Sequence, residues 1–317
     1  MTRAAAAVVV LAPRLGAVLP APAVPLLRAG APVLADSDLP GALRERFGAG
    51  PAGDSVAGLL LTLDATTGAA ARWAAAGAEV ITTPQPAGAA LLDAVAVMDR
   101  LRSPGGCPWD AEQTHASLMP YLIEETYELY QALEDGDRAA LREELGDVLL
   151  QVLFHARLSA EATGGFDVDA VAAELVAKLV GRHPHVFTGT KSVHTASDQQ
   201  VRWEELKRTE KRRESSVDGV AFGQPAVALV AKLVSRAARA GLPTDLLPAG
   251  PQPGEALFAL AARAELAGED PEAALRAAAR RFADDVRAAE RSARCAGLDP
   301  EELTPGQWHE HWPLRGP

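Results

Sequence analysis

The segment YLIEETYELYQALEDGDRAALREELGDVLLQVLFHARL, residues 121–158, carries the clearest structural pattern in the chain. Its apolar residues recur every three or four positions, which predicts two helices, roughly 116–134 and 138–162. Only the turn Glu134-Asp135-Gly136-Asp137 separates them, with Asp137 as the expected N-cap of the second helix. Because this connection is short, the two helices should be antiparallel neighbours.

Each predicted helix carries a cluster of carboxylates. The first has Glu124, Glu125 and Glu128, and the second has Glu144 and Asp147. Residues three or four positions apart share one face of a helix, so the acids within each cluster lie side by side and repel one another. A doubly positive ion between the helices would relieve that repulsion.

The two clusters should face each other across the hairpin. Glu128 comes nine residues before Asp137 and Glu144 seven residues after it, so they lie at similar heights above the turn. The neighbouring positions, such as Ile123 and Leu145, are apolar, and both helices are therefore expected to be largely buried. Buried carboxylates need a partner or a metal, and Mg²⁺ or Mn²⁺ prefers such oxygen ligands. The alternative is an ordinary solvated acidic face.

The composition narrows the class of protein. Of the 317 residues, 48% are hydrophobic and only 5% aromatic, which favours closely packed helices and a mostly α fold. The net charge of -11 argues against nucleic-acid polymers as partners. Cys107 and Cys295 alone indicate no disulfide framework, so a cytoplasmic location is expected. The apolar run near the N-terminus is too short to span a bilayer, and no membrane association is expected.

Three domains are expected along the chain. Residues 1–88 read as a small α/β module of unassigned role, because apolar runs at 7–11, 58–63 and 79–83 resemble short buried strands. Residues 89–214 read as a helical domain that carries the carboxylates.

Residues 215–317 read as a degenerate helical repeat of the middle domain. GEALFALAAR, residues 254–263, echoes GDVLLQVLFHAR, residues 146–157. A Pro-rich segment at 248–253 stands where the first carboxylate helix would be expected. The acids are not kept in this second copy, although its helical pattern persists. This indicates that the fold does not need the acids.

The carboxylates favour hydrolysis of phosphoric anhydrides. Di-iron sites on helical bundles use a Glu-x-x-His pattern, whereas His155 lies eight residues after Asp147. Mg²⁺ held by carboxylates suits phosphate substrates, since it neutralises their charge and lowers the pKa of an attacking water.

These residues also carry a family resemblance. The stretches CPWDAEQTHASLMPYLIEETYELYQAL, LREELGDVLLQVLFHARL and KLVGRHPHVF resemble the catalytic domain of MazG-type nucleoside triphosphate pyrophosphohydrolases, whose motif is EExxE followed by ExxD. The match covers about residues 90–212, and residues 217–317 resemble a degenerate second MazG domain. The resemblance implies an all-α fold, a site built by helix pairs of two subunits in a homodimer or larger oligomer, and conversion of NTP and water to NMP and pyrophosphate.

The resemblance also implies roles for individual residues. The ligands of Mg²⁺ would be Glu125, Glu128, Glu144 and Asp147, with Glu124 as a further ligand or as the group that orients the nucleophilic water.

Five more residues are candidates for substrate contacts. Lys178 and Arg182, four positions apart on one helix, would contact the triphosphate, and Lys207 could reach a phosphate. Trp109 and Trp203 are candidates to stack on the base. For each of the five, a packing or solvated role is the alternative.

The sequence therefore predicts a Mg²⁺-dependent pyrophosphohydrolase of broad nucleotide specificity that removes damaged or surplus nucleotides. One alternative is a relative restricted to dCTP, dUTP or phosphoribosyl-ATP. Another is a non-catalytic dimer that binds nucleotide or metal as a regulator.

Overall fold

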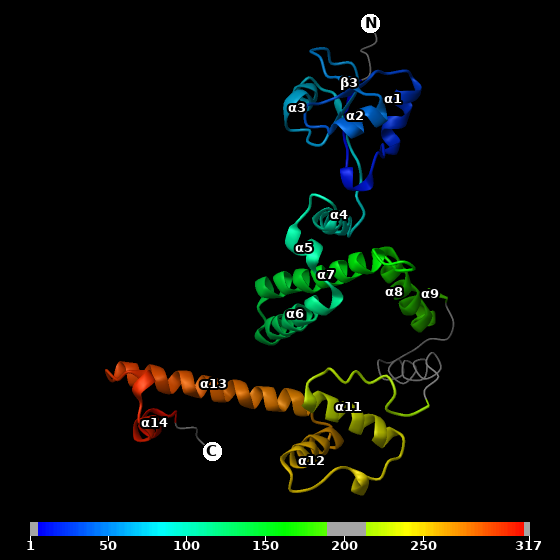
Figure 1. The fold of residues 1–317 in the computed structure, drawn as a ribbon. Helices are drawn as coiled ribbons and strands as arrows, with labels where there is room; N and C mark the ends of the chain where they lie inside the picture. The colour runs from blue at the N-terminus through cyan, green and yellow to red at the C-terminus, as the bar shows by residue number, and fades with distance from the viewer. Residues whose placement is uncertain (1–5, 189–213, 314–317) are drawn as a thin grey trace. The chain divides into compact units, whose positions relative to one another are not determined.

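The computed structural model describes residues 6–188 and 214–313, and it divides into two compact units, Met1–His183 and Pro184–Pro317 (Figure 1). Helices make up 61% of the structure, which confirms the prediction of a mostly helical protein. The first unit holds a small parallel sheet followed by helices. The domain limits predicted at residues 88 and 214 stay predictions.

A five-stranded, all-parallel sheet forms the N-terminal module, in the order β3-β2-β4-β1-β5. Its strands are β1 (Ala6–Val10), β2 (Val33–Ala35), β3 (Gly50–Pro51), β4 (Gly58–Thr62) and β5 (Glu79–Thr82). The expected α/β module is thus present. The three predicted strands are found as β1, β4 and β5. The sequence pattern missed β2 and β3, because two or three residues are too few to show a period.

Helices cover both faces of this sheet. They are η2 (Ala21–Ala23), α1 (Val24–Arg28), α2 (Gly41–Phe47) and α3 (Gly68–Ala75), while the short η1 (Pro13–Leu15) after β1 contacts the helix that follows the sheet. Val8 and Leu60, paired across β1 and β4, pack with Trp73 of α3 on one face. Val9 and Leu61, the next residues along, belong to the core on the opposite face. Burial on both faces explains why these strands read as continuous apolar runs.

The predicted helical hairpin forms in the rest of the first unit. The helices there are α4 (Ala90–Arg102), α5 (Pro108–Glu112), α6 (His115–Asp135), α7 (Arg138–Ala160) and α8 (Val168–Arg182). Figure 1 shows α6 and α7 lying side by side, and the two helices pack against each other. Helix α5 begins at Pro108, because proline suits the first helical position.

Local sequence signals fix both ends of α6 and the start of α7. Thr114 caps α6 in a capping box with Ser117. Gly136 ends the helix in the left-handed region at a φ of 67°. The carboxylate of Asp137 then accepts hydrogen bonds from the backbone N–H groups of Ala139 and Ala140. The N-cap predicted at Asp137 is confirmed.

The expectation that both hairpin helices are largely buried is wrong for the single chain. Ile123 is 51% exposed and Leu145 53% exposed. A core cluster that includes Met98, Leu118 and Phe154 covers the hairpin mainly at the end away from the turn. The apolar spacing was read correctly as helical, but within one chain there are too few elements to cover every apolar face.

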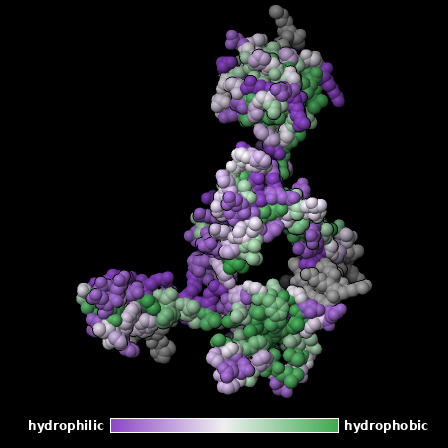
Figure 2. All heavy atoms as spheres, in the orientation of Figure 1, coloured by the Kyte–Doolittle hydropathy of each residue, from purple (hydrophilic) through white to green (hydrophobic). Residues whose placement is uncertain are grey.

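The described part of the second unit consists of helices and turns. It contains α9 (Pro184–Phe187), α11 (Ala226–Arg239), η3 (Thr244–Leu246), α12 (Pro253–Leu266), α13 (Pro271–Cys295), η4 (Pro300–Glu302) and α14 (Pro305–His311). Here α11 packs against α12, so a helix does precede the residues 254–263. The Pro-rich segment 248–253 forms the last part of the connection from α11 to α12. The expectation that it stands in place of the first helix is therefore wrong. Figure 2 shows hydrophobic residues gathered over this hairpin.

Among the described residues, no helix has the length and apolar character needed to cross a membrane.

Candidate active site

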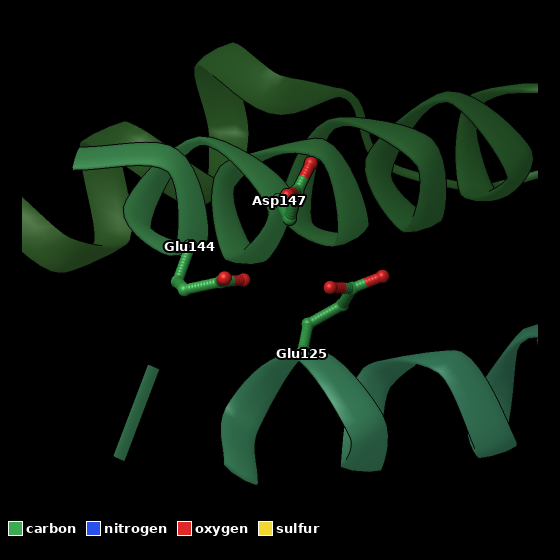
Figure 3. Close-up of side chains that lie close together, drawn as sticks. All are labelled: Glu125, Glu144 and Asp147. Carbon is green, nitrogen blue, oxygen red and sulfur yellow. The ribbon is translucent and has the colours of Figure 1, made fainter. Parts of the chain in front are cut away.

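Three of the predicted metal ligands meet between α6 and α7. Glu125 of α6 projects toward Glu144 and Asp147 of α7 (Figure 3). One carboxylate oxygen from each lies within 4.8 Å of the others. All three side chains are only partly exposed. Three negative oxygens in this space form an oxygen-rich set that a hard divalent cation would fit.

The pKa values of Glu125 and Glu144 are raised. The pKa of Glu125 is raised by partial loss of hydration and then by the charge of Asp147, with smaller effects from neighbouring acids. The pKa of Glu144 is raised by the same loss of hydration and by the charge of Glu128. In the described part of the chain, no Lys or Arg forms an ion pair with any of the five acids. The site therefore has unbalanced negative charge.

Glu124 and Glu128 lie at the edge of this group. Both are exposed, and neither belongs to the set of oxygens within 4.8 Å. Glu128 and Glu144 instead line a cavity of about 340 Å³ that extends toward the hairpin turn, where Tyr127 and Gln131 also contribute. The acidic site thus opens onto a space with polar and aromatic walls.

The predicted substrate contacts are only partly described. Lys178 and Arg182 both lie on α8, and Lys178 is exposed. Trp109 lies on α5 and makes edge-on contacts with Tyr121 and Phe154, at ring-centroid distances of 6.1 and 6.5 Å. Trp109 is 51% exposed, which leaves part of its ring free to contact a ligand. Its stacking on a base stays a prediction.

The candidates Trp203 and Lys207 fall within residues 189–213. They lie outside the described residues.

A row of polar residues on α7 continues from the acids and was not predicted as part of the site. Gln151, His155 and Ser159 follow Asp147 at intervals of four. Gln151 is only 4% exposed and its Oε1 is buried without a hydrogen-bond partner. The Nδ1 atoms of His155 and His115, the first residue of α6, are 2.8 Å apart. The signal in the sequence was a polar residue at every fourth position of the segment 147–159, which is apolar elsewhere except at Arg157.

Comparison with known proteins assigns both halves of the first unit. The family model of the MazG nucleotide pyrophosphohydrolase domain matches residues 113–187, which include all five acids. The model of the MazG N-terminal domain matches residues 6–81, the span of the parallel sheet.

Relatives from several bacteria cover most of the chain. An uncharacterised 26.1 kDa protein of Streptomyces cacaoi is 53% identical over 64% of this chain and 84% of its own length. A nucleoside triphosphate pyrophosphohydrolase of Mycolicibacterium smegmatis is 45% identical over 75% of each chain. One from Mycobacterium tuberculosis is 40% identical over 96% of this chain and 94% of its own. The chain thus belongs to the MazG family of nucleoside triphosphate pyrophosphohydrolases, hydrolases that act on phosphoric anhydrides.

Proposed function

We propose that this enzyme hydrolyses nucleoside triphosphates between the α and β phosphates in a Mg²⁺-dependent reaction of broad base specificity. The observation that carries the proposal is the meeting of Glu125, Glu144 and Asp147 within 4.8 Å, where no ion pair from the described residues neutralises them. Such a charge cluster is costly in a fold unless a cation completes it.

Glu125, Glu144 and Asp147 would hold Mg²⁺, with Glu128 as a fourth ligand at the edge of the site. The donor set fits this ion, since all donors are carboxylate oxygens, and Mn²⁺ would fit the same set. When bound, the ion would neutralise phosphate charge and lower the pKa of a water. Glu124, beside Glu125 on α6, would orient the attacking water through its carboxylate.

The cavity beside Glu128 and Glu144 gives room for part of the substrate. Its volume of about 340 Å³ lies at the lower end of the range for small-molecule sites. Lys178 and Arg182 are proposed to contact the triphosphate. Trp109, Trp203 and Lys207 remain further candidates for substrate contacts.

We also propose that the enzyme works as a homodimer or larger oligomer. The support is the exposed apolar surface on the two helices that carry the acids, including Met119, Ile123 and Leu145, each more than half exposed. A second copy would cover these residues. Mass measurement in solution by light scattering tests this, and a strictly monomeric active enzyme would rule it out.

A cytoplasmic location is proposed on cysteine usage. Cys107 and Cys295 are both free thiols, as expected in a reducing compartment.

One assay tests the reaction and its specificity. The enzyme is incubated with each ribo- and deoxyribonucleoside triphosphate and Mg²⁺, and NMP and pyrophosphate are quantified. Similar kcat/KM values across the bases are expected. Turnover of dCTP or dUTP alone would favour the restricted alternative, while NDP and orthophosphate as products would refute cleavage between the α and β phosphates.

A further inference from the structure

A second feature of the hairpin is the pair of parallel imidazoles at the end away from the turn. The rings of His115 and His155 are nearly parallel, with an interplanar angle of 7° and centroids 5.1 Å apart. Their Nδ1 atoms are 2.8 Å apart, a hydrogen-bond distance. The Oγ of Ser159 lies 3.5 Å from Nε2 of His115. The contact joins the first residue of α6 to the last third of α7.

The acids lie between the two places where α6 and α7 are joined, the turn at Gly136-Asp137 and the contact of His115 with His155. Along α6, Glu125 comes ten residues after His115 and eleven before Gly136. Along α7, Asp147 comes ten residues after Asp137 and eight before His155. Glu125 and Asp147 are therefore about 12–17 Å of helix from the turn and from the histidine pair. At one end of the hairpin the covalent turn joins the helices, and at the other end the histidine pair joins them by a directional hydrogen bond.

We propose that His115 and His155 are positioning residues, whose contact sets the rotation and spacing of α6 against α7 and so the separation of Glu125 from Glu144 and Asp147. The apolar cluster around Leu118 and Phe154 also joins the helices here, but such packing is non-directional. A hydrogen bond between two rings fixes an angle as well as a distance. The inference rests on the proposed role of the carboxylates in binding metal.

The surroundings of the two rings differ. Nε2 of His155 is buried without a hydrogen-bond partner, whereas His115 is exposed. His115 can thus donate from Nδ1 to Nδ1 of a neutral His155. If both rings were protonated, two N–H groups would face each other. The pKa of His155 is lowered by burial and by the charge of His115.

The other charged groups around the pair are largely committed to each other. Arg102 of α4 pairs with Glu161, and Arg157 pairs with Asp99 and Glu161. Asp110 and Glu112 lie on α5, and Asp167 and Asp169 lie at the start of α8. Because the pKa of His155 is lowered, the contact should be fully present above pH 6.5 and lost as the pH falls through the lowered value.

The test measures binding of Mn²⁺ alone, by calorimetry or electron paramagnetic resonance, in His155→Phe, His115→Phe and the double variant. Phenylalanine keeps an aromatic ring at the position and removes the hydrogen bond. Each single variant should bind Mn²⁺ about tenfold more weakly at pH 7.5, as for residues that orient metal ligands. The double variant should be no weaker, because either change breaks the same contact. The matched control is His309→Phe, at an exposed position of α14, which should bind Mn²⁺ as the wild type does.

A second readout separates positioning from simple loss of stability. Between pH 7.5 and 5.5 the Mn²⁺ affinity of the wild type should fall more steeply than that of either single variant, which lacks the second imidazole. If His155→Phe does not fold, His115→Phe alone carries the test, since His115 is exposed and its replacement removes no core volume.

Mn²⁺ affinity and pH dependence equal to wild type in both single variants would overturn the positioning role and leave the proposed function intact. Absence of Mn²⁺ binding in the wild type would overturn both.

Discussion

The two helix pairs α6–α7 and α11–α12 have similar architecture but differ in their acidic residues. The first pair brings three carboxylates within 4.8 Å, and the described residues contain no second group of this kind. In the second pair α11 has no acidic residue, and α12 has only Glu255 and Glu265. A helical hairpin therefore folds without the acids, and the acids must be explained by chemistry.

The two hairpins also differ in how they are joined. Two residues, Gly136 and Asp137, connect α6 to α7, whereas residues 240–252 connect α11 to α12. A short connection fixes the register of the two helices, and a long one leaves it to packing. The helices that carry the acids have the tighter connection, as a site with defined ligand spacing requires.

The largest expected difference between the hairpins is catalytic. Glu128→Ala should lower kcat/KM for a nucleoside triphosphate on the order of 10²-fold or more, because a group that stabilises phosphate charge through the metal is lost. Glu255→Ala, an exposed acid of α12, is the matched control and should change turnover less than about twofold. Equal activities of wild type and Glu128→Ala would remove the distinction between the hairpins.

The next difference concerns metal and stability. Saturating Mg²⁺, at about 100 times its Kd, should stabilise the enzyme by about 2.7 kcal/mol, measured as a rise in Tm over the protein in chelator. Asp147→Asn should lose most of this rise, since it removes a charged ligand. An undiminished rise in Asp147→Asn would place the ion elsewhere.

The connection of the first hairpin gives a smaller effect. Gly136→Ala should cost about 1 kcal/mol in urea unfolding, because Gly136 has a φ of 67° that L residues adopt with strain. No neighbouring atom would block the added methyl group, so backbone strain is the whole cost. Gly254→Ala is the control within α12. It should be neutral or stabilising by up to about 1 kcal/mol, as for glycine in a helix.

The smallest effect is electrostatic. In chelator at pH 7, Glu125→Gln should raise the Tm by about 1 °C, since it removes like-charge repulsion. The raised pKa of Glu125 means that the folded state binds its proton more tightly than the unfolded state. Its stabilising contribution is thus present below pH 4.5 and lost as the pH rises through the raised value. The advantage of the glutamine variant should disappear on acidification, and a constant advantage would point to another cause.

The sequence predicted the helices of the first hairpin to within two residues at each end, because its signals are local. Thr114, Gly136 and Asp137 act on the backbone within their own turn. The strands β1, β4 and β5 were also predicted. Strands β2 and β3 were not, since their edge of the sheet depends on pairing with β4 rather than on any pattern of their own.

The sequence by itself determined which helices form and at what height each acid stands above the turn. Only the tertiary structure decided that Glu125, rather than Glu128, joins Glu144 and Asp147, and that His115 meets His155. It also decided that Ile123 and Leu145 remain exposed in one chain. The physical reason is that a period of 3.6 residues defines the faces of each helix. How one helix is rotated against another is set by packing between residues far apart in sequence.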